Sequence, residues 1–526
     1  MRYLLHGVLV IGMLAAAGCG GGGGGTVAGG TAPGGPTWTS GVFQTASTFE
    51  NQCASPRTGT DPFTGTAYPD KKGTLLLENN WLRSWTNELY LWYAEVPDQN
   101  PSLFTSTANY FDVLKSSAVT ASGSAKDKFH FTYPTSTWKT LSQTNVQAGY
   151  GAQFAVLAGT PPREVIVAYT EPNSPAVAPS AALARGTELL QVDGVDVVNA
   201  NDQASVDKLN AGAFPQASGE SHTFVVRDVG ASSVRTITMV SADVQTQPVQ
   251  NVHTISTSMG TVGYILFNDH LATSEQALIA AFNTLKTAAV NDLVLDIRYN
   301  SGGYLDIASE VAYMIAGDAA TAGQTFEKIE FNDKHPLTDP VTGATIQPVP
   351  FHATSQGFSV TAGQALPTLN LPRVFLLTGS DTCSASEAII NGLQGVNVQV
   401  IQIGATTCGK PYGFYPQDNC GTTYFSIEFR GVNAQGFGDY TDGFTPVAGS
   451  SQGANVPGCS VADDFTHALG DVAESRLATA LAYQANPGTC SVAPVVIQKP
   501  TLTAMNKSAH PLLFKGPWRS NRVLRR

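Results

Sequence analysis

VFLLTGSDTCSASEAIINGLQGVNVQVIQIGATTCGK, residues 374–410, is the stretch that decides the fold. Its apolar runs at 374–377 and 398–403 predict two buried strands, and the segment that begins at Ser384 predicts a helix between them. A serine at the first turn of a helix that follows a buried strand presents its hydroxyl above the sheet, close to the positive end of the helix. Ser384 is therefore the candidate nucleophile.

A serine hydroxyl needs a base that removes its proton, and no histidine lies close to Ser384 in the sequence. Lys410 stands in a glycine turn shortly after the second predicted strand. A lysine acts as a base only when it is neutral, so its pKa must fall from about 10.4 to roughly 7–8. Desolvation between apolar strands favours such a shift. Lys410 is therefore the candidate general base.

At these residues the chain resembles the C-terminal processing, or tail-specific, serine proteases, which use a Ser-Lys dyad and carry a PDZ domain. The resemblance rests on TCSASE at 382–387, where the family usually has TASASE, and on the Gly-Lys turn that follows. It implies that Ser384 is the nucleophile and Lys410 the general base. Phe414 stands where many members have a glutamine, so Glu387 is the candidate for a third, orienting residue.

A second glycine turn supplies candidate oxyanion donors. Residues 293–298 predict a buried strand that breaks into YNSGG at 299–303. Two adjacent glycines let the backbone turn sharply and direct its N–H groups at a small volume. The resemblance matches this turn to the Asn-x-Gly-Gly element of the family. It implies that Gly302 or Gly303, together with the backbone N–H of Ala385, stabilises the oxyanion.

The N-terminal residues predict export. One arginine precedes an apolar run that ends at Leu14, and small residues then lead to Cys19. Residues 1–19 are expected to be a secretory signal peptide, because the run is too short for a stable transmembrane helix. Small residues before a cysteine resemble a bacterial lipoprotein cleavage site. We therefore expect a lipid on Cys19 and a flexible glycine-rich tether over 20–40.

The composition fits an exported protein. Charged residues make up 13% of the chain, about half the ~25% of ordinary soluble domains. The net charge of -11, with no long basic face in the body, argues against a nucleic-acid ligand. The expected location is the bacterial cell envelope, on the periplasmic side, with the lipid on Cys19 in the outer or inner membrane. Secretion without an anchor is the alternative.

The six cysteines that follow Cys19 predict disulfides, because their number is even and the compartment is oxidising. Two pairings would affect the candidate site, and the sequence does not choose between them. Cys383 with Cys408 would link the nucleophile to the base, whereas Cys408 with Cys420 would close the loop that carries Phe414. No two cysteines have the close spacing of a zinc site, and no metal or organic cofactor is implied.

The rest of the chain predicts three further regions and a tail. Residues 41–140 are expected to be helical, because large apolar side chains recur every three to four residues in part of that range. Short strands over 141–246 resemble a PDZ domain. That resemblance implies that a peptide C-terminus is captured by the loop Tyr150-Gly151-Ala152-Gln153-Phe154. Strands and helices alternate over 247–490, and residues 491–526 are basic without an acidic residue, which predicts a disordered tail.

The predicted fold is an α/β protease core with crotonase-like ββα layers, an inserted PDZ-like domain and a small N-terminal helical region. The expected function is that of a serine endopeptidase that cleaves polypeptides near unstructured C-termini. One alternative is a non-catalytic lipoprotein that keeps the peptide-binding module, which the replacement at Phe414 favours. Another is a crotonase-like enzyme that acts on acyl thioesters, since paired glycine amides also stabilise an enolate.

Overall fold

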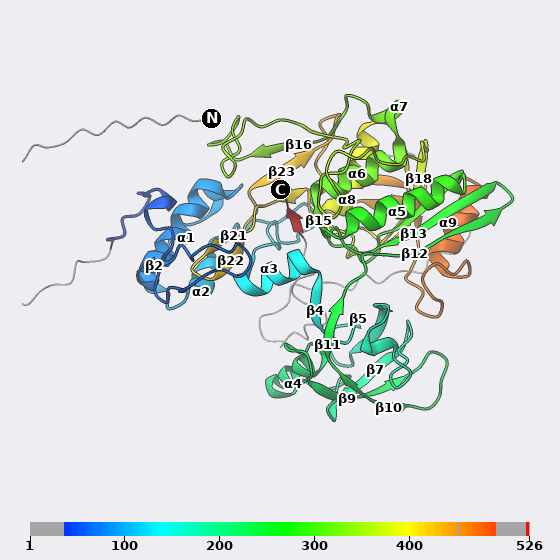
Figure 1. The fold of residues 1–526 in the computed structure, drawn as a ribbon, viewed down its shortest axis with the longest axis horizontal. Coiled ribbons are helices and arrows are strands. Elements are labelled where there is room, and N and C mark those ends of the chain that lie inside the picture. Colours follow the sequence, from blue (N-terminus) through cyan, green and yellow to red (C-terminus); the bar gives the residue numbers. More distant parts are fainter. Residues whose placement is uncertain (1–35, 450–451, 491–521, 525–526) are drawn as a thin grey trace, which may run out of the picture. The chain divides into compact units, whose positions relative to one another are not determined.

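The computed structural model describes residues 36–449, 452–490 and 522–524. Residues 38–526 belong to one compact unit, and Figure 1 shows its helices and strands. Cys19 and the predicted signal peptide lie outside the described residues, as does most of the predicted tether. Within the described part of the chain, no helix combines the length and apolar character that a membrane span requires.

The largest sheet has seven strands in the order β12-β13-β14-β18-β19-β25-β24, and every neighbouring pair except β12 with β13 is parallel. Its strands are β12 (Val249–Thr257), β13 (Gly260–Phe267), β14 (Asp292–Asp296), β18 (Arg373–Thr378), β19 (Gln399–Gly404), β24 (Thr445–Val447) and β25 (Asn455–Ser460). The helices that pack on it are α5 (Ser274–Thr287), α6 (Leu305–Ala316), α8 (Ala385–Gly395) and α9 (Ser475–Ala485). The predicted strand, turn, helix and strand around Ser384 are confirmed as β18, α8 and β19 (Figure 1).

Both faces of this sheet are buried. Leu293 and Leu295 of β14 belong to one apolar cluster with α5, α6 and α8, whereas Val294 belongs to a second cluster with α9. Neighbouring residues of a strand point to opposite faces, so a strand covered on both faces must be apolar at every position. This explains the apolar runs in the middle of β14 and β18, and the predicted mixed α/β core is confirmed.

A second sheet, with its own apolar core, lies between β4 (Val146–Gly149) and β11 (Ala242–Gln245), which pair with each other. Its strands are β5 (Ala152–Ala158), β6 (Glu164–Thr170), β7 (Glu188–Val192), β8 (Val195–Asp196), β9 (Ser221–Arg227) and β10 (Arg235–Val240), and it carries the helix α4 (Gln203–Ala213). The order is β10-β9-β7-β6-β5, so β5 is an edge strand. The strands predicted in this range are confirmed, while the identity of the module as a PDZ domain stays a prediction.

The N-terminal part contains α1 (Leu75–Leu89), α2 (Thr107–Val113) and α3 (Thr135–Thr144), with short 3-10 turns between α1 and α2. Trp81 and Trp85 of α1 stack on each other with ring centroids 5.2 Å apart, and both rings contact Tyr424. Both indole side chains are buried, so the tryptophans of α1 form a core, as the sequence predicts.

The N-terminal part also contains a two-stranded sheet of β1 (Gln52–Cys53) and β2 (Lys71–Lys72), and three further small sheets lie elsewhere in the described residues. They contain β16 (Thr325–Phe331) with β17 (Val349–Pro350), β20 (Tyr412–Gly413) and β23 (Phe429–Val432); β3 (Phe131–Pro134) with β21 (Gln417–Asn419) and β22 (Thr422–Phe425); and β15 (Gly302–Tyr304) with β26 (Arg522–Leu524). The pattern of residues 424–429 predicts one strand, but these residues are divided between the end of β22 and the start of β23, so that prediction is wrong. Of the tail over 491–526 that is predicted to be disordered, only 522–524 are described, and they form β26; the prediction for the other residues lies outside the described residues.

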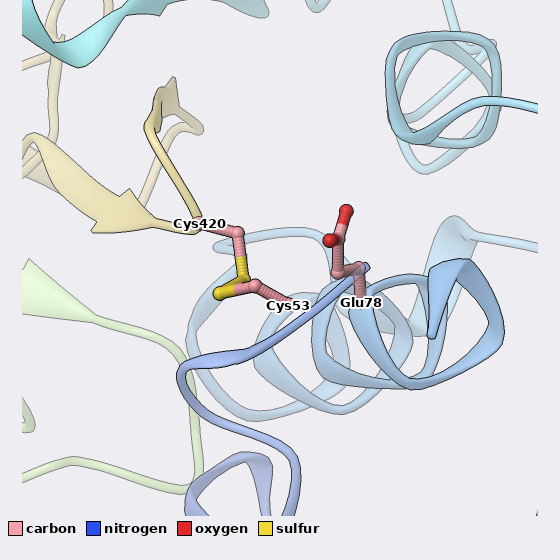
Figure 2. A group of neighbouring side chains, drawn as sticks. All are labelled: Cys53, Glu78 and Cys420. Atoms are coloured by element: carbon pink, nitrogen blue, oxygen red, sulfur yellow. A yellow bond between two sulfur atoms is a disulfide. The ribbon is translucent and has the colours of Figure 1, made fainter. Parts of the chain in front are cut away.

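The predicted disulfides are present and pair Cys53 with Cys420, Cys383 with Cys408, and Cys459 with Cys490. Of the two pairings considered for Cys408, the one with Cys420 is wrong. Figure 2 shows the Cys53–Cys420 disulfide beside Glu78, whose carboxylate accepts the N–H of Ala54 at 2.7 Å. This disulfide joins the N-terminal part to the turn between β21 and β22.

Two buried carboxyl groups hold the segment that follows β17. Glu275 accepts backbone N–H groups from four residues, at 2.7–3.0 Å, namely Gln356, Gly357, Ser359 and Val360. Glu310 also accepts the N–H of Gln356 at 2.9 Å. Burial, followed by the neighbouring charge of Glu275, raises the pKa of Glu310 to about 9. Glu310 is therefore protonated at neutral pH.

We expect Glu310→Gln to remove a pH-dependent loss of stability. Because the folded-state pKa of Glu310 lies above its unfolded value, its carboxyl favours the folded state at low pH and loses that contribution as the pH rises towards 9. As the pH rises over this range, the free energy of unfolding of the variant minus that of the wild type should therefore increase by on the order of 1 kcal/mol per pH unit. Denaturant unfolding at pH 5, 7 and 9 measures this, with the exposed Glu164→Gln as control. Parallel curves for wild type and Glu310→Gln would contradict it.

Candidate active site

Ser384 lies at the turn between β18 and α8, where it precedes the first residue of the helix. Its φ of 59° is in the left-handed region, which residues other than glycine rarely adopt and which marks a strained turn. The side chain is buried, and its hydroxyl has no hydrogen-bond partner among the described residues. The N–H of Ala385 lies in the first turn of α8, where amides have no partner within the helix.

The carboxylate of Glu387 connects the serine turn to the lysine turn. One oxygen accepts the N–H groups of Ser384 at 2.9 Å and Lys410 at 2.8 Å. The other accepts the N–H of Gly409 at 2.8 Å and the hydroxyl of Thr407. Glu387 is fully buried, and this burial raises its pKa although the four hydrogen bonds act in the opposite direction. The bond to Lys410 comes from its backbone N–H and not from its side-chain amine. Glu387 therefore connects the two turns and positions both.

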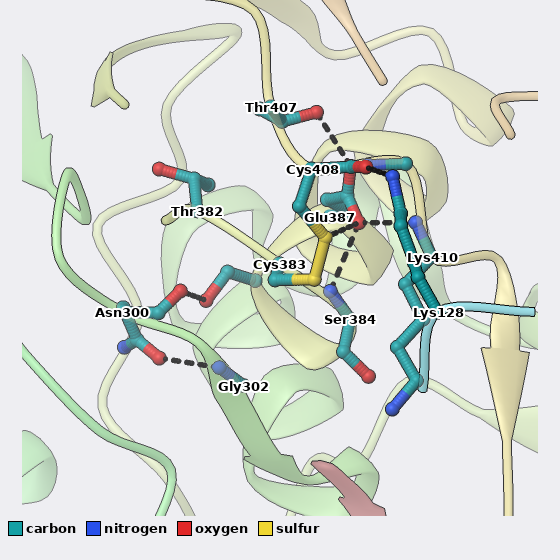
Figure 3. The surroundings of a disulfide bond; sticks show 12 residues. Lys128, Asn300, Gly302, Thr382, Cys383, Ser384, Glu387, Thr407, Cys408 and Lys410 are labelled. Atoms are coloured by element: carbon teal, nitrogen blue, oxygen red, sulfur yellow. Dashed lines mark hydrogen bonds between the residues drawn. A yellow bond between two sulfur atoms is a disulfide. The ribbon is translucent and has the colours of Figure 1, made fainter. Parts of the chain in front are cut away.

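Lys410 is also buried, with 1% of its surface exposed. Its Nζ lies 4.2 Å from the ring centroid of Phe414 and 4.8 Å from that of Phe129. Phe414, which replaces the glutamine expected from the resemblance, thus forms a wall of the lysine pocket. In Figure 3 the Lys410 side chain extends towards the side of the site to which the Ser384 hydroxyl points.

The disulfide between Cys383 and Cys408 is a second connection between the two turns (Figure 3). Cys383 precedes Ser384 directly, and the N–H of Cys408 donates to the carbonyl of Thr382 at 3.0 Å. Within the described residues, the two clusters with metal-ligating side chains are Cys383, Glu387 and Cys408, and Cys53, Glu78 and Cys420. Each contains a disulfide, whose sulfurs are not the thiolates that bind metal ions.

The glycine turn after β14 is held by Asn300. Its Oδ1 accepts the N–H of Gly302 and the Nδ1–H of His270, each at 2.9 Å, and its Nδ2 donates to the carbonyl of Phe267. Burial lowers the pKa of His270 to about 3, so its ring is neutral. Because the N–H of Gly302 is already bonded, Gly303 is the better oxyanion donor of the two predicted glycines.

Gly303 needs to be glycine. Its φ of 143° lies in the positive range, and a Cβ at this position would lie 2.3 Å from the carbonyl oxygen of His270. The N–H of His270 donates to the carbonyl of Gly302, and the N–H of Tyr304 donates to the carbonyl of His270. Since polar groups alternate along a strand, the N–H and carbonyl of Gly303 face the opposite edge of β15.

Lys128 is a residue of this site that the sequence analysis missed. Its Nζ donates to the carbonyl of Cys408 at 2.8 Å, and burial lowers its pKa (Figure 3). Lys128 is separated from Cys408 by 280 residues, so no sequence pattern connects the two.

The predicted capture loop of the second sheet is shorter than expected. Ala152, Gln153 and Phe154 begin β5, so only Tyr150 and Gly151 form the turn before it. This turn lines a pocket with Gln147–Gly149, Glu171 and the end of α4. The prediction of a five-residue loop is therefore wrong, but the turn that it includes does border a pocket.

Comparison with known families identifies peptidase domains. Residues 261–413 match the model of Peptidase family S41, and residues 78–130 match that of the Peptidase S41 N-terminal domain. The first match includes both candidate glycines and all residues of the serine and lysine turns. The chain therefore contains two regions that match models of the S41 peptidase family.

Individual proteins agree with this assignment. The chain is similar to the carboxyl-terminal-processing protease of Picosynechococcus sp., with 24% identity over 224 residues, which cover 42% of this chain and 51% of that protein. It thus spans about half the length of this relative.

One solved structure shows a similar fold, and a second gives a weaker match. A Bacteroides fragilis NCTC 9343 protein assigned to the S41 proteases has a TM-score of 0.57 and 22% identity, covering 80% of this chain and 98% of its own. The photosystem II D1 C-terminal processing protease has a TM-score of 0.43 and 19% identity, covering 72% and 92%.

We expect Glu387→Gln to destabilise the protein by about 2–4 kcal/mol, because the amide presents an NH2 group to backbone donors that then lose their acceptor. Denaturant unfolding without reductant measures the loss while the Cys383–Cys408 disulfide stays intact. The exposed Glu50→Gln serves as control and should change stability by less than about 0.5 kcal/mol. Equal stability of the two variants would show that Glu387 does not hold the turns together.

Proposed function

We propose that this protein is a serine endopeptidase that cleaves polypeptides near unstructured C-termini, with Ser384 as nucleophile and Lys410 as general base. The observation that carries the proposal is the buried carboxylate of Glu387, which binds the backbones of both residues. It brings together two turns that are distant in the sequence. The S41 domain that spans these turns supports a peptidase.

The geometry supports a defined division of roles. The Ser384 hydroxyl attacks the scissile carbonyl, and Lys410 accepts its proton and then donates a proton to the leaving amine. The N–H groups of Gly303 and Ala385 stabilise the negative oxygen of the tetrahedral intermediate. A water molecule then hydrolyses the acyl-enzyme by the same steps in reverse, with Lys410 again as the base.

The lysine pocket is suited to a neutral amine. A lysine can accept a proton only when it is uncharged, and hydration favours the charged form. The rings of Phe129 and Phe414 lie within 5 Å of Nζ and exclude water from it. These rings also restrict where the amine can lie, so Phe414 takes over positioning that a glutamine would supply by a hydrogen bond.

Residues 141–246 are proposed to be a PDZ-like module that binds the C-terminal end of a polypeptide. An extended peptide can add to the free edge of β5, and the pocket at its start can receive the terminal carboxylate on backbone N–H groups. This would deliver an unstructured tail to the protease core. A lipid on Cys19, in the cell envelope, remains part of the proposal.

A non-catalytic peptide-binding lipoprotein is the second candidate function. It is favoured by Phe414, which stands where many related peptidases have a glutamine. Binding of peptides by the second sheet without any cleavage would support it.

We expect Ser384→Ala and Lys410→Ala each to lower kcat for an unfolded polypeptide by at least about a thousandfold, since each removes one half of the nucleophile-base pair. Mass spectrometry of the products measures the turnover. Lys286→Ala, at an exposed position in α5, is the matched lysine control and should keep full activity. Unchanged turnover in either of the first two variants would overturn the assignment.

We expect Phe414→Ala to move the acid limb of the pH-rate profile to higher pH. The smaller side chain admits water to Nζ, and water favours the charged lysine, so a higher pH is needed to produce the neutral base. The pH dependence of kcat/KM measures this shift. An unchanged acid limb would mean that the ring does not keep the amine dry.

A further inference from the structure

The last described residues of the chain lie at the candidate active site. β26 pairs in parallel with β15, and the register places Gly302 opposite Arg522, Gly303 opposite Val523, and Tyr304 opposite Leu524. β26 also contacts β20, which begins two residues after Lys410. It therefore lies between the glycine turn and the strand that follows the lysine turn (Figures 1 and 3).

β26 pairs with the edge of β15 to which a substrate would bind when its scissile carbonyl approaches the oxyanion donors. His270 occupies the other edge, through its bonds to Gly302 and Tyr304, so the polar groups of Gly303 face β26. A scissile carbonyl must bring its oxygen to an oxyanion donor such as the N–H of Gly303. A strand that pairs along this edge competes with the substrate for that N–H.

The segment that precedes β26 is basic and is tethered to the largest sheet. Residues 491–526 contain seven of the 29 lysines and arginines and none of the 40 acidic residues. The disulfide from Cys490 to Cys459 fixes the start of this tail to β25. A tethered segment has an effective concentration in the range of millimolar, so even weak pairing keeps it bound.

We propose that residues 522–524 are an intramolecular inhibitor, which occupies the place of the substrate strand beside Gly303 and is displaced by a polypeptide substrate. This inference rests on the proposed peptidase function. No covalent step is involved, because the tail and the substrate compete for the same backbone edge.

The kinetics of three variants of the whole protein, one of which lacks 522–526, test whether the tail competes with the substrate. Deletion of 522–526 and the double variant Val523→Pro with Leu524→Pro should each lower KM by at least about fivefold with kcat unchanged, because proline has no N–H for strand pairing. The proline variant keeps every charge of the tail. Lys499→Ala with Lys507→Ala, which removes two charges but keeps 522–524, should leave KM near the wild-type value. Equal KM in the deletion, the proline variant and the wild type would overturn the proposal, as would a drop in KM only when charge is removed.

A binding measurement separates this proposal from the proposed function. A labelled peptide of residues 516–526, GPWRSNRVLRR, should bind to the Ser384→Ala protein that lacks 522–526 and not to the same protein with its tail. A scrambled peptide of the same composition should bind at least about tenfold more weakly, since its charge is equal but its strand sequence is lost. If the tail peptide binds more tightly than the scrambled peptide but the wild type hydrolyses no unfolded polypeptide, the tail site is retained and the peptidase function is rejected. If the wild type hydrolyses an unfolded polypeptide but the tail peptide and the scrambled peptide bind equally, the peptidase function is retained and the tail site is rejected.

Discussion

The structure depends on one buried carboxylate. Glu387 lies one turn into α8 and accepts hydrogen bonds from the serine turn behind it and from the lysine turn that follows β19. Burial of a carboxylate is costly unless donors compensate for the lost water, and here backbone amides and the Thr407 hydroxyl do so. The Cys383–Cys408 disulfide adds a covalent connection between the same turns. Two independent links therefore hold the serine turn and the lysine turn, which carry the proposed nucleophile and base, close together.

The parallel sheet places the three turns together. β14, β18 and β19 are neighbours, and the chain leaves each at its carboxyl end into the glycine turn, the serine turn and the lysine turn respectively. The carboxyl ends of neighbouring parallel strands meet at one edge, where open α/β sheets bind their ligands. Asn300 joins the first two turns, because its carbonyl accepts the N–H of Cys383 and the hydroxyl of Ser386. The proposed oxyanion donors, nucleophile and base are thus positioned by three adjacent strand ends.

The sequence predicts the parts of this site that depend on local order. Apolar runs and glycine turns are enough to place Ser384, Lys410 and the two glycines at the ends of strands. The function of Glu387 as a connector could not be predicted, because its partners Gly409 and Lys410 lie more than twenty residues away in a turn of unknown position. Lys128 and β26 were missed for the same reason, since both come from segments that pair with the site only in the folded chain. The boundary between β22 and β23 was missed because an unbroken alternation of apolar and polar residues hides a change of sheet.

The most direct measurement of the central claim is the site at which a fluorophosphonate probe reacts with the protein lacking residues 522–526, found by peptide mass spectrometry. Such probes react with a serine whose hydroxyl is activated by a neighbouring base. The account predicts one adduct, on the peptide that contains Ser384, and its loss in Lys410→Ala. An adduct that forms equally well without the lysine, or no adduct on Ser384, would contradict the claim that the amine at position 410 activates the hydroxyl at 384.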